Sequence, residues 1–312
     1  MYRLNPEQIL RQLPPWLESR LNPLPDESWA ELEEIRLKPD CPLLLRLRNG
    51  ERFLTAEGAL TVSPSLGEIF PQEEMDKLLS TLSGSSLYAM EEELRNGYMT
   101  IAGGHRVGFS GRGVLEKGRI RTLRDISSVN IRLARAVLGV GQELLPRLLD
   151  GQGNVLSTLI ISPPGVGKTT LLRDLARAIA DGEGVPSLRV GIVDERSEIA
   201  AMWRGKPQLP VGLRSDVLDG CPKAEGLMLL LRSMSPQVLI CDELGRPEDV
   251  SAMREAANAG VSVLATAHGL DGGDLLKRPV FREMLTTGCF HRLVILSRRL
   301  GPGTVERVYD PC

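Results

Sequence analysis

The sequence predicts an α/β fold, with a mostly parallel sheet in its second half and a small α/β (α+β) domain before it. Two observations support this prediction. The 312 residues are about twice the ~150 of a typical domain, so two domains are expected. After residue 134, apolar strands alternate with amphipathic helices, which is typical of parallel sheets joined by right-handed crossovers.

Charge and composition argue against several classes of protein. The 38 Lys and Arg residues nearly balance the 40 Asp and Glu residues, leaving a net charge of −2. That balance disfavours a protein held to nucleic acid or to an anionic membrane by bulk charge. Aromatic residues make up 4% of the chain, too few for base-stacking platforms. No nucleic-acid partner is therefore expected.

The cysteines and the N-terminus indicate the compartment. The five cysteines are odd in number and scattered, without a CxxC pair, so we expect neither a disulfide framework nor a zinc site. The first residues carry charges and prolines instead of the apolar core of a signal peptide. The longest apolar stretches, such as Leu227–Leu231, fall far short of the ~20 residues of a membrane span. We expect a cytoplasmic chain that meets a membrane only through partners.

Residues 1–134 are expected to form the first domain. Prolines punctuate its first 25 residues and predict a short helix and an extended proline-rich arm. From Glu31 onwards we predict strands around a turn at Pro39–Pro42, with a hairpin at Asn49-Gly50 between Leu43–Arg48 and Glu51–Leu54. Helices are predicted at Pro71–Leu82 and Ser86–Asn96. They are followed by a glycine-rich strand region at Gly97–Val114 and a strand pair at Arg119–Leu123 and Val129–Leu133.

Residues 135–312 are expected to form the second domain. Its predicted helices are Gly141–Leu149, Thr169–Ala180, Ala224–Met234 and Pro247–Ala259. Its predicted strands are Leu156–Ile161, Leu188–Val193, Val238–Cys241 and Val261–Ala265, followed by an antiparallel hairpin of Arg292–Ser297 and Thr304–Tyr309 around the turn at Gly301–Gly303.

A phosphate-binding loop stands between an apolar strand and an amphipathic helix. In such a loop, backbone N–H groups and the helix N-terminus bind the phosphate oxygens. Here Lys168 is expected to reach the β- and γ-phosphates, and the Thr169 hydroxyl to ligate Mg²⁺. The usual first glycine is replaced by serine, but Gly165 and Gly167 keep the tight part of the loop. The residues assigned to the nucleotide are Ser162, Pro163, Pro164, Gly165, Val166, Gly167, Lys168, Thr169 and Thr170.

A second acidic motif follows the strand Val238–Cys241. Asp242 is expected to support Mg²⁺ and Glu243 to polarise the attacking water. The element order puts at least one strand between the two motifs, which fits a RecA-like ATPase of the ASCE class better than a kinase or GTPase. No NKxD guanine signature is present, so ATP is the expected nucleotide.

Two further segments are candidates for the same site. Asp194, Glu195 and Glu198 follow the strand that we place next to the P-loop, at the edge where open α/β sheets bind ligands. Thr266 and His268 end another strand and are candidate sensors of the γ-phosphate.

These motifs resemble a known family. The stretches PPGVGKTTLLRDLAR, VDERSEIAA, DVLDGCPKAEG and LSRRLGPGTVERVYD resemble the stage III sporulation protein AA family, with likeness over nearly the whole chain. More remotely, the second half is similar to type II and type IV secretion ATPases. That likeness implies an Asp box at Asp194, Glu195 and Glu198, a Walker B motif at Asp242 and Glu243, and a His box at His268. Secretion ATPases commonly carry Gly where Asp242 stands, so the main catalytic carboxylate is either Glu243 or Glu198.

The resemblance also implies partners. It implies a hexameric ATPase on the mother-cell side of the engulfing membrane, which powers or assembles a channel with membrane proteins of the stage III sporulation operon. It implies that arginines of the first domain face the phosphates, where a fixed guanidinium suits the developing charge. The candidates are Arg106, Arg112, Arg121, Arg124 and Arg132, whereas His105 in the GGHR segment is expected to be a turn residue.

Three functions remain open at this point. The first is an ATP-hydrolysing mechanoenzyme in which Lys168, Glu243, Glu198 and His268 carry the chemistry. The second is a nucleotide-gated scaffold that assembles or recruits membrane partners with little turnover. The third, a nucleic-acid-dependent ATPase, is disfavoured by the charge and aromatic content.

Overall fold

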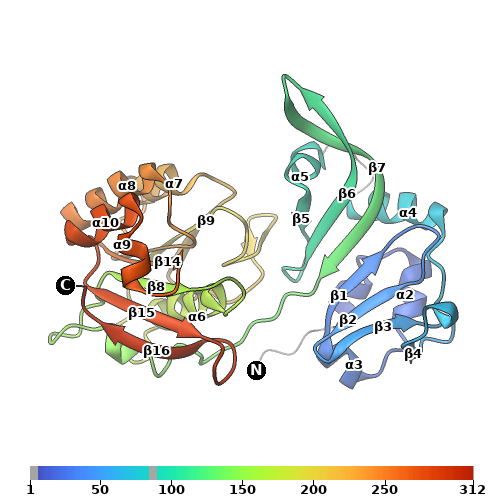
Figure 1. Cartoon of the computed structure of the whole chain (residues 1–312), viewed down its shortest axis with the longest axis horizontal. Helices are drawn as coiled ribbons and strands as arrows, with labels where there is room; N and C mark the ends of the chain where they lie inside the picture. Colours follow the sequence, from blue (N-terminus) through green and yellow to red (C-terminus); the bar gives the residue numbers. More distant parts are fainter. Residues whose placement is uncertain (1–5, 84–89, 312) are drawn as a thin grey trace. The chain divides into compact units, whose positions relative to one another are not determined.

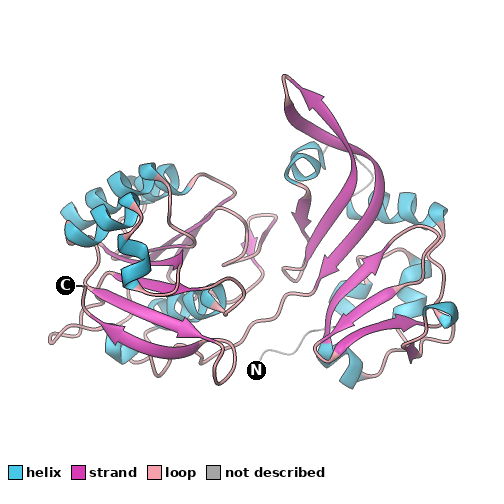
Figure 2. Cartoon of the chain, viewed as in Figure 1, coloured by secondary structure: helices cyan, strands magenta, loops and turns pink. Residues whose placement is uncertain are grey.

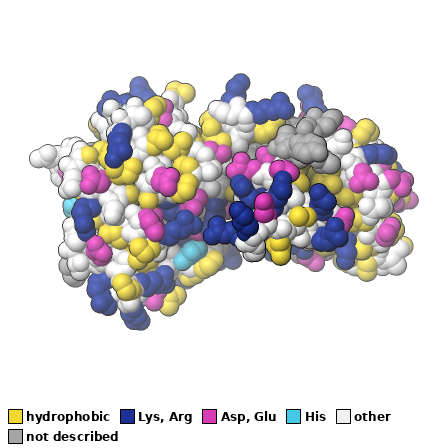
Figure 3. Space-filling view, turned by 90° about the horizontal axis from the view of Figure 1, so that it is seen from above, with side chains coloured by type: hydrophobic (Ala, Val, Ile, Leu, Met, Phe, Trp, Pro, Cys, Tyr) yellow, Lys and Arg dark blue, Asp and Glu magenta, His cyan; other side chains and the backbone are white. Residues whose placement is uncertain are grey.

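The computed structural model describes residues 6–83 and 90–311 and divides into two compact units. The first unit runs to Arg135 and includes Trp203–Gln208; the second contains Ala136–Met202 and the chain from Leu209 onwards. Each has its own seven-stranded sheet (Figures 1 and 2). On the face drawn in Figure 3, basic and acidic side chains are interspersed. Among the described residues, no helix is long and apolar enough to cross a membrane.

The sheet of the first unit is antiparallel throughout, in the order β4-β3-β2-β1-β7-β6-β5. The hairpin predicted at Asn49-Gly50 is confirmed, with Leu44 opposite Phe53 and Leu47 opposite Gly50. The strands are β1 (Leu32–Leu37), β2 (Leu44–Leu47), β3 (Gly50–Leu54), β4 (Leu60–Thr61), β5 (Tyr98–Thr100), β6 (Arg106–Glu116) and β7 (Arg119–Arg132).

The extended arm predicted within the first 25 residues is wrong, because the described part of this segment forms two short helices, and a third begins at Asp26. Pro6 and Pro15 are the first residues of the first two, a position where the missing proline N–H costs no helical hydrogen bond. Ile9, Leu17 and Leu21 are fully buried in the core of this unit. The helices of the unit are α1 (Pro6–Leu10), α2 (Pro15–Leu21), α3 (Asp26–Glu31), α4 (Gln72–Leu82) and α5 (Glu91–Asn96), with a 3-10 turn at Pro64–Leu66.

Two further predictions for this unit need correction. The strand pair predicted within 119–133 is one continuous strand, β7, because β6 pairs with it from Arg106↔Arg132 to Glu116↔Arg119. The helix predicted over Ser86–Asn96 begins at Glu91 in the described chain, and residues 84–89 lie outside the described residues. Met90 and Leu94, from its predicted apolar face, are buried.

The second unit contains the predicted mostly parallel sheet, in the order β12-β9-β13-β14-β8-β15-β16. Every pair is parallel except the predicted terminal hairpin β15–β16. The sequence predictions did not include the edge strand β12. The strands of its sheet are β8 (Thr158–Ser162), β9 (Val190–Asp194), β12 (Ser215–Asp219), β13 (Val238–Cys241), β14 (Ser262–His268), β15 (Arg292–Ser297) and β16 (Thr304–Tyr309). A separate two-stranded sheet consists of β10 (Met202–Trp203), which begins at the last residue before the segment Trp203–Gln208 of the first unit, and β11 (Lys206–Pro207), which lies in that segment.

Helices cover both faces of this sheet (Figure 2). Ile160 of β8 packs with α6 on one face, while Leu159 and Ile161 pack with α7, α8 and α10 on the other. Both faces are therefore apolar, which explains why the strand is a continuous apolar run. The helices are α6 (Lys168–Asp181), α7 (Lys223–Ser233), α8 (Pro247–Asn258), α9 (Gly272–Leu276) and α10 (Pro279–Thr286), of which the sequence predictions did not include α9 and α10.

The helix predicted at Gly141–Leu149 is replaced by turns and a 3-10 helix at Leu145–Leu148. Pro146 cannot donate a helical hydrogen bond and clashes with the preceding turn of an α-helix, so it is tolerated only in the first turn. The N–H of Gly141 is instead bonded to Oδ2 of Asp174 on α6, at 2.8 Å.

Candidate functional site

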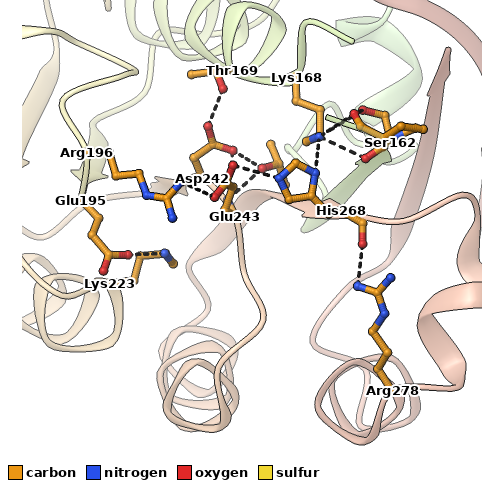
Figure 4. Close-up of polar contacts among 12 residues, drawn as sticks. Ser162, Lys168, Thr169, Glu195, Arg196, Lys223, Asp242, Glu243, His268 and Arg278 are labelled. Carbon is orange, nitrogen blue, oxygen red and sulfur yellow. Dashed lines mark hydrogen bonds and ion pairs between the residues drawn. The ribbon is translucent and has the colours of Figure 1, made fainter. Parts of the chain in front are cut away.

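The predicted site residues of the second unit gather at the carboxyl ends of β8, β9, β13 and β14 (Figure 4). This is the edge at which open α/β sheets bind ligands. One predicted neighbour is wrong: β9 does not lie beside the P-loop strand, because β13 and β14 stand between β9 and β8. Consequently β14, which carries Thr266 and His268, is a neighbour of the P-loop strand β8. It separates β8 from β13, the strand that ends just before Asp242.

The P-loop joins β8 to α6 through two residues in the left-handed backbone region. Gly165 has φ 71° and Gly167, which caps α6, has φ 103°, so a side chain at either position would be strained. Ser162, where the usual motif has glycine, is fully buried. Its hydroxyl oxygen lies 3.2 Å from Nζ of Lys168 and accepts a hydrogen bond there, a contact that glycine could not make.

Lys168 is the first residue of α6 and is 5% exposed. Its Nζ donates to the carbonyl oxygens of Ser162 at 3.1 Å and Pro163 at 3.0 Å, and lies 3.0 Å from Nδ1 of His268. Burial lowers the pKa of Lys168, while the nearby carboxylates of Asp242 and Glu243 act in the opposite direction. The ammonium group is therefore held at the mouth of the loop by uncharged acceptors.

Asp242 connects three elements at the site. Its Oδ2 accepts the Thr169 hydroxyl at 2.5 Å, which ties it to α6. Its Oδ1 accepts from the hydroxyl of Thr266 on β14 and from the N–H of Glu243. Thr169 and Asp242 thus bring a hydroxyl and a carboxylate oxygen to one point, the type of donor set that Mg²⁺ prefers.

Glu243 lies between a histidine and an arginine. Its backbone is in the left-handed region, with φ 52°, and its N–H is bonded to Oγ1 of Thr266 at 2.9 Å. Oε1 lies 3.0 Å from Nε2 of His268, and Oε2 lies 2.9 Å from Nη1 of Arg196. Arg196 was not among the predicted site residues, although it stands within the quoted VDERSEIAA stretch.

The three predicted acids after β9 occupy different positions. Asp194 is buried and accepts the N–H groups of Glu198, Ile199 and Ala200 at 2.8 to 3.0 Å, so it shapes the loop. Burial raises the pKa of Asp194 and these N–H groups act against that rise. Glu195 is ion-paired with Lys223 and Arg246. Glu198 lines one pocket together with Asp194, Glu195, Arg196, Lys223, Asp242 and Glu243.

A buried arginine joins the P-loop helix to this loop. Arg173 of α6 is 7% exposed and donates to the carbonyl oxygens of Glu198 and Ile199. Burial lowers its pKa to about 10, and the charge of Asp194 counters the effect. Arg173 therefore remains charged at neutral pH and fixes the acidic loop against α6.

Two of the predicted arginines of the first unit, Arg106 and Arg112, are engaged within that unit. The Arg106 guanidinium lies over the ring of Tyr98, 3.6 Å from its centroid, and Arg112 is ion-paired with Asp125 at 3.1 Å. His105 is buried, and its Nδ1 accepts the N–H of Ala134 at 3.1 Å. His105 is therefore a buried turn residue, as the sequence predicts.

A third group of contacts was not predicted at all. Arg298 donates through Nη2 to the carbonyl of Gly165, and the N–H of Gly303 donates to the carbonyl of Val166 at 2.7 Å. Both residues belong to the turn between β15 and β16, which the sequence marks only by its GPG glycines. No local pattern indicates that this turn reaches the P-loop.

The fold and the arrangement of this site define a RecA-like P-loop ATPase fold preceded by a separate N-terminal unit. Solved structures with this architecture include the ATPase DotB of Legionella pneumophila, with a TM-score of 0.56, 16% identity, and coverage of 94% of this chain and 76% of that chain. Another is the pilus retraction motor PilT bound to ADP, with a TM-score of 0.55, 14% identity, and coverage of 85% and 74%. At these identities the likeness concerns the fold.

The chain belongs to the family described as "Sporulation stage III, protein AA", which matches residues 7–311. It is 48% identical over 304 residues to the Stage III sporulation protein AA of Bacillus subtilis (strain 168), covering 97% of this chain and 94% of that protein. The family predicted from the sequence motifs is thereby confirmed.

Proposed function

We propose that this chain binds ATP with Mg²⁺ at its P-loop and hydrolyses it. One observation carries the proposal: Lys168, His268 and Glu243 form an unbroken chain of contacts, with both links 3.0 Å long. The chain of contacts connects a P-loop lysine to a carboxylate that can accept a proton from water.

The residues fit a magnesium nucleotide. Gly165 and Gly167 give the loop its left-handed backbone, with φ values of 71° and 103° that residues with a side chain rarely adopt. Thr169 and Asp242 supply the hydroxyl and carboxylate oxygens of a Mg²⁺ site. The buried Lys168 ammonium supplies the positive charge that phosphate oxygens require.

Each residue has a distinct part in the proposed reaction. When bound, Mg²⁺ supplies charge that stabilises the transferred phosphoryl group. Lys168 binds the phosphates, and Thr169 with Asp242 holds the metal. Glu243 orients a water molecule and accepts its proton at Oε1 or Oε2, while His268 keeps Glu243 aligned with Lys168. Glu198, on the wall of the same pocket, is the alternative carboxylate.

We extend the proposal to the cell. The chain is proposed to act as a mechanoenzyme of the secretion-ATPase type that powers or assembles the sporulation channel between mother cell and forespore. It would act on the cytoplasmic, mother-cell side as a hexameric ring, together with membrane proteins of that channel. Residues 1–134 and 135–312 would work as two domains, and Arg106 or Arg112 of the first would approach the nucleotide. The fold of DotB and PilT, and the family membership, support this extension.

The test compares Lys168→Ala with Lys277→Ala, which removes an exposed lysine beside α9. Lys168→Ala should lose ATP binding and turnover while its thermal unfolding stays close to that of the wild type. Lys277→Ala should behave as the wild type does. Equal ATP hydrolysis by wild type and Lys168→Ala would remove the basis of the proposal.

A nucleotide-gated scaffold is the second candidate, and one observation favours it. Both carboxylate oxygens of Glu243 already have a partner, Oε1 at His268 and Oε2 at Arg196, which leaves fewer free lone pairs for an attacking water. Glu243→Gln should bind ATP without turning it over. If cells carrying this variant still form spores, binding alone suffices and the scaffold is favoured; if they fail, hydrolysis is required.

A further inference from the structure

The turn between β15 and β16 lies against the outer side of the P-loop. Arg298 Nη2 lies 2.5 Å from the carbonyl oxygen of Gly165, and the Gly303 nitrogen lies 2.7 Å from the carbonyl oxygen of Val166. Two consecutive P-loop carbonyl groups are thus bonded to a turn more than a hundred residues away in the sequence. We call residues 298–303 the strap.

Peptide geometry gives these two hydrogen bonds a consequence. In a trans peptide the C=O and N–H groups point in opposite directions, and the described chain has no cis peptide bonds. A carbonyl of Gly165 bonded to the strap therefore turns the N–H of Val166 away from the strap. The bonded carbonyl of Val166 does the same for the N–H of Gly167. These are the loop N–H groups that form an anion-binding concavity.

The strap is itself held in shape. The Gly301 nitrogen is bonded to the Arg298 carbonyl at 3.0 Å, and the Thr304 hydroxyl donates to the carbonyl of Gly301 at 2.7 Å. Arg299 points to β16, where its Nε is 3.0 Å from Oε1 of Glu306. The two adjacent arginines thus have different tasks: Arg299 fixes the strap to its own hairpin, and Arg298 fixes the strap to the P-loop.

We propose that the strap presets the P-loop for phosphate and that Arg298 is a positioning residue for nucleotide binding. This inference rests on the proposed function, because it concerns the same nucleotide site. An unbound phosphate loop must order its N–H groups before they can bind an anion, and this ordering lowers affinity. Hydrogen bonds on the carbonyl side supply that order in advance, without contact to the ligand.

The opposing explanation is that Arg298 acts through its charge on the phosphates. The two explanations predict different results for substitutions that separate charge from hydrogen bonding. Arg298→Lys keeps the charge and a donor, Arg298→Gln keeps a donor without the charge, and Arg298→Ala keeps neither. Arg307→Ala is the matched control, because it removes an exposed arginine from β16 of the same hairpin.

The experiment measures Kd for ATP with Mg²⁺ by calorimetry, and amide hydrogen exchange of Gly303 in the nucleotide-free protein. Loss of one hydrogen bond should raise Kd of Arg298→Ala about five- to tenfold. Exchange at Gly303, whose N–H is bonded to the Val166 carbonyl, should be faster in this variant without nucleotide, because the strap has lost its other bond to the P-loop. Arg298→Lys and Arg298→Gln should both recover part of the affinity, and Arg307→Ala should match the wild type.

Three results would contradict the proposal. If Arg298→Ala binds as the wild type does and exchanges at the same rate, the strap has no positioning role, and the proposed function is unaffected. If Arg298→Gln loses as much affinity as Arg298→Ala with unchanged exchange, Arg298 acts through charge. If the wild type binds ATP no better than Lys168→Ala, both this inference and the proposed function fail.

Discussion

Nζ of Lys168 lies 3.0 Å from Nδ1 of His268, and this contact decides which ring nitrogen accepts a hydrogen bond. A lysine ammonium group can only donate, so Nδ1 must accept and Nε2 carries the hydrogen. Nε2 lies 3.0 Å from Oε1 of Glu243, so the same hydrogen is donated to the carboxylate. His268 is thus a bridge that couples the position of the P-loop lysine to that of Glu243.

Removing this bridge should affect turnover more than binding. In His268→Ala, Lys168 keeps its contacts with Ser162 and Pro163, so Kd for ATP should change less than about threefold. Glu243 loses its alignment, and kcat should fall about tenfold or more. Steady-state ATPase assays and calorimetry check both numbers, with His291→Ala, at an exposed histidine, as the control. A large loss of binding with unchanged kcat would contradict the bridge.

The two candidate carboxylates should separate by substitution with glutamine. Glu243→Gln keeps the shape but cannot accept a proton, so kcat should fall about 10²-fold or more with little change in Kd. Glu198→Gln should cost less, because Glu243 and not Glu198 is joined to Lys168 through His268. Single-turnover ATP hydrolysis measures the difference. A greater loss in Glu198→Gln would identify Glu198 as the main base.

Asp194 should matter for stability because it pairs three backbone N–H groups. Asp194→Ala would leave the N–H groups of Glu198, Ile199 and Ala200 without their acceptor, and should cost about 3 kcal/mol or more in the free energy of unfolding. Asp194→Asn keeps one acceptor oxygen and should lose less. Urea unfolding measures both, with Asp216→Ala on β12 as the control. Unchanged unfolding of Asp194→Ala would show that the loop does not depend on it.

The pH dependence of stability should include a contribution from His105. Burial lowers the pKa of His105 to about 4 in the folded chain, against about 6.5 in the unfolded chain. Between these values the unfolded chain binds the additional proton, so stability is complete above about pH 6.5 and falls by at most about 3 kcal/mol as the pH drops to 4. The melting temperature of His105→Asn, which keeps an acceptor for Ala134, should fall less over this range. Equal slopes would contradict the assignment.

The elements that the sequence predicted well are those with a strong local pattern. The apolar run of β8, the helix after Lys168 and the hairpin at Asn49-Gly50 each follow from residues close together in the chain. The elements predicted wrongly are those that tertiary contacts decide. The leucines of α2 form a helix because the core buries them, and β7 is continuous because β6 lies beside it along its whole length.

The same division applies to the site. Sequence motifs identified Lys168, Thr169, Asp242 and Glu243, because strand, loop and helix are contiguous around each motif. They could not identify Arg196 as the partner of Glu243, or Arg298 as the partner of Gly165. Each of these contacts joins segments that are far apart in the chain, and only the strand order brings them together.

The sequence by itself determined the family, the mostly parallel sheet and the chemical groups that a phosphate-binding site needs. The tertiary structure alone decided how those groups are connected: Lys168 to His268, His268 to Glu243, and the strap to the P-loop. The physical reason is that local hydrophobic periodicity and turn residues act between near neighbours. A hydrogen bond of 3 Å between distant segments depends instead on the packing of the entire sheet.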